Sequence, residues 1–317
     1  MTAPTAVATT LTTKGIREDL EDVIYRVAPQ KTPFTSSIGS AKATNTNHEW
    51  QTETLTAADA TNAHVEGDSV SQVGAENLTT RVGNYCQIFW KSGGVSRTDE
   101  IVKKAGRTSE MNRQKILKGI ELRTDIEKRF IGNYASGAES GATPRYSAGL
   151  QAYLTSNTSN GVGGSNAGAT GSAVTLAVAG TTRTFTESLV KTVLATAFGN
   201  GAMPTQCYVG GTHKQQFSAF TGIASIRADV KGKEQATIYA GADMYVSDFG
   251  AIAIIPHQYG MGSSALFVDP EMAAVATLDG IKTEALAKSS DSENFLMTAE
   301  KTLVCKNEKA HAVIRAI

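Results

Sequence analysis

Several features are scarce in this chain, and each scarcity excludes a class of protein. Only three cysteines occur in 317 residues, at Cys86, Cys207 and Cys305. An odd, widely spaced set of this kind builds neither a disulfide framework nor a zinc ribbon, and it is typical of a reducing compartment. No stretch approaches the roughly 18–20 consecutive apolar residues that a membrane span requires. The N-terminus also lacks the basic start and apolar block of a secretory signal, so we expect a protein made in the cytoplasm with no membrane segment.

An excess of one charge is also missing. Thirty Lys and Arg residues balance thirty Asp and Glu residues, and the isoelectric point is about 7.0. A protein whose main task is to coat nucleic acid normally has a basic excess. The balance therefore excludes that class, although one face of the molecule can still be basic.

Small residues are abundant. The chain has thirty glycines and only 7% aromatic residues, while hydrophobic residues reach 41%, which is enough to bury a core. This composition predicts long loops and arms relative to the core. It suits a protein whose packing is completed by neighbouring copies.

Residues with catalytic potential are present, but they form no convincing catalytic constellation. None of the five histidines forms a metal-ligand pair, no G-x-S-x-G nucleophile elbow occurs, and Ser188 and Lys191 lack a companion motif. The glycines at 161, 163 and 164 lack the strand and helix that flank a phosphate-binding loop, and Gly232-Lys233 is followed by Glu234, where a P-loop has Ser or Thr. We therefore predict no catalytic residue, no cofactor and no metal site.

Two helices are expected in the first half of the chain. Apolar residues recur at helical spacing over 16–27, including Ile16, Leu20 and Ile24, and Pro29 ends that helix. A longer helix is predicted over 108–134, because this stretch contains no proline and keeps an apolar stripe.

Between these helices the sequence predicts an extended hairpin. Strand-like segments at 48–55 and 81–91 flank a polar tip, and no lysine or arginine occurs from Asn45 to Thr80. The returning segment carries Tyr85, Phe89 and Trp90. An isolated two-stranded hairpin is marginally stable in water, so we expect something else to cover it.

The rest of the chain predicts an α+β fold. Residues 136–182 are rich in glycine and serine and indicate a loop or small insertion of unassigned role. Helices are expected at 187–198 and 214–220, and the last 23 residues at 295–317 as a strand pair joined by a turn. The other expected strands are 206–209, 244–247, 251–256, 266–268 and 272–278.

Two stretches resemble a known family. Residues 14–25 (KGIREDLEDVIY), continued by 28–34 (APQKTPF), resemble the start of tailed-bacteriophage major capsid proteins. Residues 295–307 (FLMTAEKTLVCKN) and 310–314 (AHAVI) are similar to the strand–turn–strand with which such proteins return to their peripheral domain. The resemblance implies the HK97-type capsid fold over nearly the whole chain.

The family fold implies a division of the chain and a set of contacts. Its segments would be an N-arm (1–45), an extended loop (46–95), a peripheral domain with a spine helix (96–182), an axial domain (183–290) and return strands (291–317). The residues implied at subunit interfaces are Ile16, Leu20, Ile24, Trp50, Tyr85, Phe89 and Trp90.

The resemblance also implies a function. The chain would be a non-enzymatic shell protein of the virion that forms hexamers and pentamers around double-stranded DNA, which it contacts weakly and without sequence preference. Assembly in the host cytoplasm would involve a separate scaffolding protein and a portal, with a decoration protein as a further candidate partner. The loop from 45 to 80 has no lysine, which argues against the lysine–asparagine crosslinks of some relatives. The alternatives are an encapsulin-type nanocompartment shell and a soluble α+β enzyme of unrecognised family.

Overall fold

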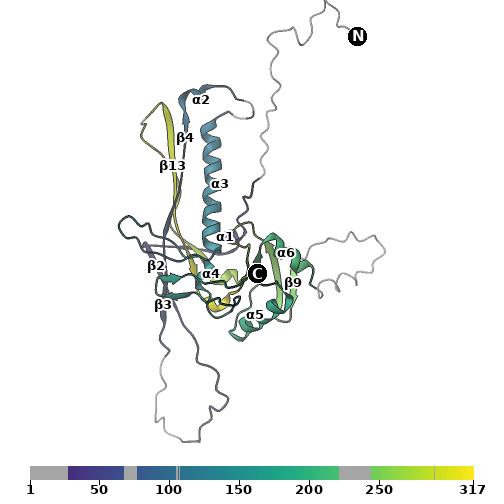
Figure 1. Cartoon of the computed structure of the whole chain (residues 1–317). Helices are drawn as coiled ribbons and strands as arrows, with labels where there is room; N and C mark the ends of the chain where they lie inside the picture. The colour runs from purple at the N-terminus through teal and green to yellow at the C-terminus, as the bar shows by residue number, and fades with distance from the viewer. Residues whose placement is uncertain (1–27, 68–76, 105, 107, 221–243, 289) are drawn as a thin grey trace, which may run out of the picture.

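The computed structural model describes residues 28–67, 77–104, 106, 108–220, 244–288 and 290–317 (Figure 1). The helix predicted over 16–27, with the interface candidates Ile16, Leu20 and Ile24, lies outside these residues.

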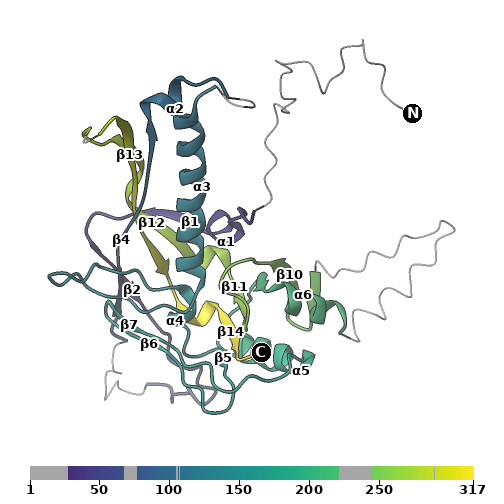
Figure 2. The same cartoon turned by 45° about the horizontal axis from the view of Figure 1, so that its top comes forward.

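A four-stranded sheet and one long helix form the upper part of the molecule in Figure 1. The strand order is β1-β12-β13-β4, in which only β1 and β12 run parallel. The bounds are Gly39–Lys42 (β1), Ala273–Ala285 (β12), Ser292–Cys305 (β13) and Gln87–Ser96 (β4). Figure 2 shows the helix α3 standing along this sheet.

The helix α3 (Glu110–Ile131) is held at its start by two side-chain caps. The Ser109 hydroxyl accepts a first-turn N–H at 3.2 Å, and the carboxylate of Glu100, in α2 (Arg97–Ile101), accepts another at 3.0 Å. These oxygens satisfy donors that a first turn leaves free and place negative charge at the positive helix end. The helix predicted over 108–134 is confirmed.

The core of this part lies between α3 and the sheet. Phe89 of β4 meets Phe130 of α3 edge to face, with ring centroids 5.9 Å apart. Alternate residues of β13, namely Phe295, Met297 and Ala299, are also buried. The opposite face of β4 carries exposed apolar side chains, because a strand sends successive side chains to opposite faces.

A six-stranded sheet forms the second part of the molecule, in the order β5-β14-β11-β8-β10-β9. Its strands are Thr158–Ser159 (β5), Ala312–Arg315 (β14), Ser264–Val268 (β11), Gln206–Val209 (β8), Gly250–Pro256 (β10) and Met244–Ser247 (β9). The helices α5 (Glu187–Gly199) and α6 (Gly211–Ser218) pack against it and complete a second core. Both helices and the strands β8 to β11 match the predicted ranges to within three residues at each end.

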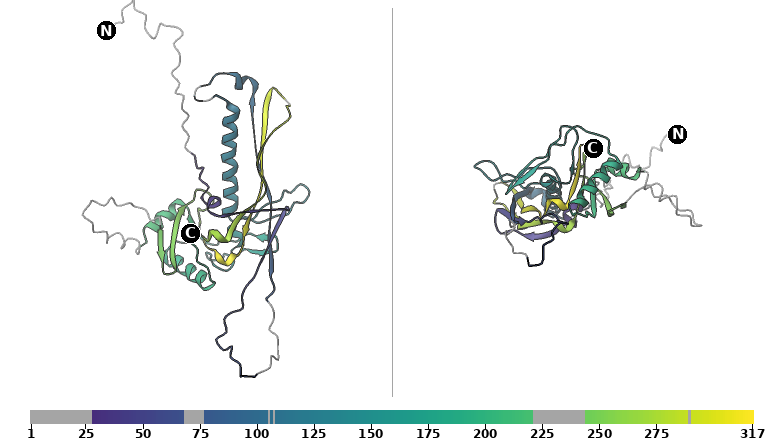
Figure 3. Two further views of the ribbon diagram at one scale, coloured as in Figure 1. Left: turned by 180° about the vertical axis from the view of Figure 1, so that it is seen from behind. Right: turned by 90° about the horizontal axis from the view of Figure 1, so that it is seen from below.

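The predicted hairpin exists, but it is shorter than expected. The strands β2 (Asn47–Thr52) and β3 (Thr80–Tyr85) pair antiparallel, and the described residues of their loop, 53–67 and 77–79, project away from the body (Figure 3). The chain leaves the hairpin at Cys86 and enters the four-stranded sheet as β4. The prediction that Phe89 and Trp90 lie on the hairpin is therefore wrong, because the apolar alternation continues across Cys86 and does not record the change of sheet.

The predicted strand pair at the end of the chain is also wrong. The strand β13 pairs with β12 and β4, whereas β14 pairs with β11 and β5 in the other sheet. The short helix η2 (Glu308–Ala310) connects them. Likewise β12, which follows the short helix η1 (Pro270–Met272), belongs to the four-stranded sheet, although the expected division put it in the axial domain. Strand periodicity indicates a strand but not its partner.

Residues 136–182 contain short ordered elements that contribute to the core. These are α4 (Leu150–Tyr153), β5, β6 (Gly168–Thr170) and β7 (Ala173–Thr175), and all four residues of α4 are buried. Just before α4, a Cβ added at Gly149 would lie 2.1 Å from the carbonyl oxygen of Gly132. This glycine is therefore required by a close approach of two backbone segments rather than by flexibility.

Candidate interface surfaces

The described residues contain no cluster with the chemistry of an active site. They hold no group of three or more His, Cys, Asp or Glu side chains that could bind a metal ion. The three cysteines are free and buried, and burial raises the pKa of the Cys86 thiol to about 11, so it is protonated at neutral pH. Among the described helices, none is long and apolar enough to cross a membrane. The surfaces of the subunit are therefore the candidates for function.

The base of the hairpin is rigidly anchored to the body. The fully buried Asn84 of β3 donates to the carbonyl of Leu303 at 2.8 Å and accepts the N–H of Ala148 at 2.8 Å. Where the chain turns at Cys86, Arg145 donates to its carbonyl at 2.6 Å and also contacts the carboxylate of Glu300 at 2.6 Å. These contacts fix the direction in which the hairpin projects.

Two predicted interface aromatics lie at the hairpin and are partly buried by their own chain. Trp50 of β2 packs against Tyr153 with ring centroids 6.1 Å apart, and it joins the apolar clusters of the body. Its indole N–H is buried and has no acceptor in the described part of the chain. Tyr85 is partly buried at the end of β3. Whether a second chain also contacts them stays a prediction.

Phe89 and Trp90 are neighbours in sequence but have opposite environments. Phe89 is only 6% exposed and packs on Phe130, so its predicted role as a side chain buried by another copy is corrected. Trp90 is 60% exposed on the outer face of β4, beside Ile88. Because β4 is an edge strand of its sheet, this face and edge are open to a further strand or chain.

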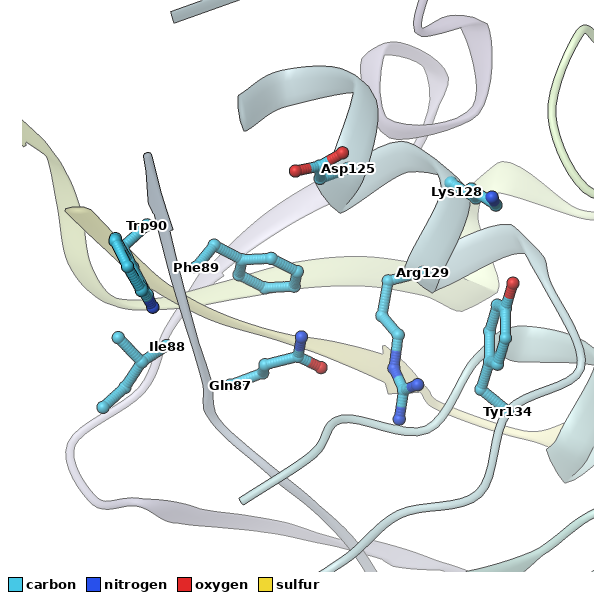
Figure 4. Close-up of a pocket in the computed structure, with 8 residues that line it drawn as sticks. All are labelled: Gln87, Ile88, Phe89, Trp90, Asp125, Lys128, Arg129 and Tyr134. Carbon is cyan, nitrogen blue, oxygen red and sulfur yellow. The ribbon is translucent and has the colours of Figure 1, made fainter. Parts of the chain in front are cut away.

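A cleft of about 410 Å³ opens between β4 and the C-terminal half of α3 (Figure 4). The Arg129 guanidinium lies 4.8 Å from the ring centre of Tyr134 and donates to two carbonyls, those of Ser147 and Ala135, at 2.6 and 2.8 Å. Burial lowers the pKa of Arg129, which has no carboxylate partner among the described residues. The cleft thus offers aromatic, apolar and cationic contacts, together with the carboxylate of Asp125.

Two further surfaces expose large apolar side chains. The hairpin loop carries Leu55, Val65 and Leu78, each at least 79% exposed. At the edge strand β9, Met244 and Val246 are exposed while Tyr245 between them is buried. The sequence analysis missed the β9 edge, although apolar residues on both faces of a short strand are a signal for an edge that another surface covers.

A profile of the SU10 major capsid protein family matches residues 3–317. The chain belongs to the SU10 major capsid protein family. It is therefore a structural protein of the virion of a tailed phage that assembles into a capsid, and its family is not one of enzymes. These comparisons give no support to the encapsulin and enzyme alternatives.

Individual relatives of this capsid protein agree with the family. The major capsid protein of Escherichia phage Phieco32 is 37% identical over 109 residues, which is 34% of this chain and 31% of that protein. The match thus spans about a third of the curated relative.

Solved structures show that the HK97-type fold covers nearly the whole chain. The Cyanophage A-1(L) capsid protein has a TM-score of 0.67 at 12% identity, covering 98% of both chains. The protein of Mycobacterium phage Bobi gives 0.61 at 10% identity over 95% of both. The Phage G structure, which contains major capsid and decoration proteins, gives 0.55 at 11% identity over 99% of both. The predicted α+β capsid fold is confirmed.

Proposed function

We propose that this capsid protein assembles as hexamers and pentamers into an icosahedral head around double-stranded DNA, with the β2–β3 hairpin reaching across a neighbouring copy. The observation that carries the proposal is the hairpin loop, where Leu55, Val65 and Leu78 have almost no cover from their own chain. Large apolar side chains left this exposed on a projecting loop favour a contact with another molecule.

The parts of the subunit then acquire roles. Residues 1–45 would be the N-arm and 46–86 the extended loop, which ends before β4. The four-stranded sheet with α3 would form the peripheral domain, and the six-stranded sheet with α5 and α6 the axial domain. The exposed edge at β9 would face the next copy around the five-fold or six-fold axis, as its apolar side chains favour.

The charge of the chain bears on its proposed contacts with DNA and between subunits, whereas the proposed protein partners are those implied by the family. A net charge of zero favours weak DNA contacts without sequence preference. The lack of lysine from 45 to 80 favours a shell held by non-covalent contacts. A separate scaffolding protein and a portal would take part in assembly in the host cytoplasm, and a decoration protein would bind the finished shell.

The hairpin role can be tested with charge substitutions in its loop. We expect the double variant Leu55→Asp with Leu78→Asp to fold normally but to form few shells, because two apolar contacts become charged. The matched control is Thr54→Asp with Thr79→Asp, which adds the same charge beside these sites without removing an apolar side chain. Electron microscopy and sedimentation measure the shells. Normal shells from the leucine variant, or equal loss in both variants, would contradict the proposed role.

A further inference from the structure

The helix α1 (Pro33–Ser37) connects the N-terminal part of the chain to both halves of the subunit. A helix of five residues is not stable alone, and the side chain of its N-cap residue, Thr32, makes no capping hydrogen bond. Pro33 has no N–H, so the donors of the first turn that need an outside acceptor are those of Phe34 and Thr35.

Both donors are satisfied by one carboxylate from the spine helix. Oε1 of Glu127 accepts the N–H of Phe34 at 2.7 Å, and Oε2 accepts the N–H of Thr35 at 2.8 Å. The Glu127 side chain is completely buried in the middle of the molecule. A buried carboxylate is costly unless its oxygens are hydrogen-bonded, so these two N–H groups and Glu127 need each other.

The six-stranded sheet reaches the same carboxylate. His257, which follows β10, places Nε2 2.8 Å from Oε1 of Glu127, and it donates because a carboxylate can only accept. Tyr208 of β8 lies beside it, with its hydroxyl 2.7 Å from Oγ of Ser37 and its ring edge-on to Phe34 at 5.6 Å. Burial raises the pKa of Tyr208 to about 12, so this hydroxyl stays protonated.

We propose that Glu127 is a positioning residue that locks the arm to the spine helix and the six-stranded sheet at once. The direction of the chain just before Thr32 is thereby coupled to the position of the six-stranded sheet relative to α3. Moving the sheet away would remove His257 from the carboxylate, and moving the arm would remove the two N–H donors. Either movement leaves a buried charge with fewer partners, so the three segments stay together or separate together. This inference does not depend on which copies the arm reaches.

The substitution Glu127→Gln tests the lock, because glutamine keeps the shape but has one acceptor oxygen for two N–H donors. We expect amide hydrogen exchange in the 33–38 segment of the full chain to become about tenfold faster, the effect of losing a hydrogen bond worth about 1.4 kcal/mol. Exchange in the β8 and β13 strands should stay within about twofold. The matched control is Glu121→Gln on the same helix, because the half-exposed Glu121 side chain pairs with Lys118 at 2.9 Å and contacts neither α1 nor His257.

A pair of variants at His257 tests the coupling to the six-stranded sheet. His257→Gln keeps an N–H donor and should leave exchange at 33–38 within about twofold of the wild type, whereas His257→Leu should accelerate it by about fivefold or more. If the arm amides exchange at the wild-type rate in Glu127→Gln or in His257→Leu, the proposal is wrong. If Glu127→Gln does not fold, the two His257 variants decide. The measurement on unassembled subunits is independent of whether shells form, so it separates this proposal from the proposed function.

Discussion

The adjacent residues Phe89 and Trp90 allow folding and assembly to be measured separately. Phe89 is buried against Phe130 and Trp90 is 60% exposed on the other face of β4. Replacing a buried phenylalanine by alanine removes contacts and leaves a cavity, which costs about 3–5 kcal/mol. Replacing an exposed side chain normally changes the free energy of unfolding by less than about 0.5 kcal/mol.

The expected effect of Trp90→Ala is therefore on association. A tryptophan side chain offers about 250 Å², so the exposed part is about 150 Å². Burial of that area by a neighbouring copy would contribute up to about 4 kcal/mol at about 25 cal/mol per Å², and ordering costs reduce this gain. The loss recurs at every equivalent contact of a shell.

Two assays on the same variants check this separation. Urea unfolding of dissociated subunits should show a large loss of stability for Phe89→Ala and almost none for Trp90→Ala. Sedimentation of assembly reactions should show few shells for Trp90→Ala despite its stable fold. Wild-type shell yield from Trp90→Ala, or a loss of several kcal/mol in its unfolding, would refute the assignment of this face to an interface.

Two further predictions concern stability within one subunit. Burial lowers the pKa of His311 from 6.5 to about 4, so below pH 6.5 the unfolded chain binds a proton that the folded chain does not. Stability should fall by about 2 kcal/mol from this group between pH 7 and pH 5, and urea unfolding of His311→Gln should lack that part of the pH dependence. Gly149→Ala should be destabilised by several kcal/mol, because its Cβ would lie 2.1 Å from a backbone oxygen. Thermal unfolding measures this loss. The control is Gly168→Ala, because a Cβ added at Gly168 meets nothing within 4 Å. An unchanged midpoint for Gly149→Ala would refute the close approach.

Local patterns were enough to predict much of the fold. The α3 helix follows from a long proline-free apolar stripe, and β8 matches its predicted range because short apolar strands bounded by turn residues are recognisable alone. The partner of a strand was not predictable, since pairing depends on residues far away in sequence. This is why β14 was assigned to the wrong sheet and why β4 was taken as part of the hairpin.

The candidate interface could be predicted only in part, because the exposure of a side chain also depends on residues far away in sequence. The sequence marks Phe89 and Trp90 equally as aromatic strand residues, and only the position of α3 decides which of them is covered. The interaction of Glu127 with the arm has no local signal, because its three partners come from two other parts of the chain. The family resemblance was enough to predict the fold, but the roles of individual residues could be assigned only from the way the side chains pack in the structure.

The parallel pairing of β1 with β12 has a consequence for synthesis of the protein. Gly39 of β1 lies opposite Ala274 of β12, so β1 cannot pair until most of the chain has been made. A ribosome that adds about 5–20 residues per second needs roughly ten to fifty seconds to make the intervening segment. During that time β4 is the main strand available to pack on the apolar side of α3, because β12 and β13 have not yet been made. In a cell that makes many identical chains at once, this delay leaves apolar surface exposed on unfinished chains and favours their aggregation.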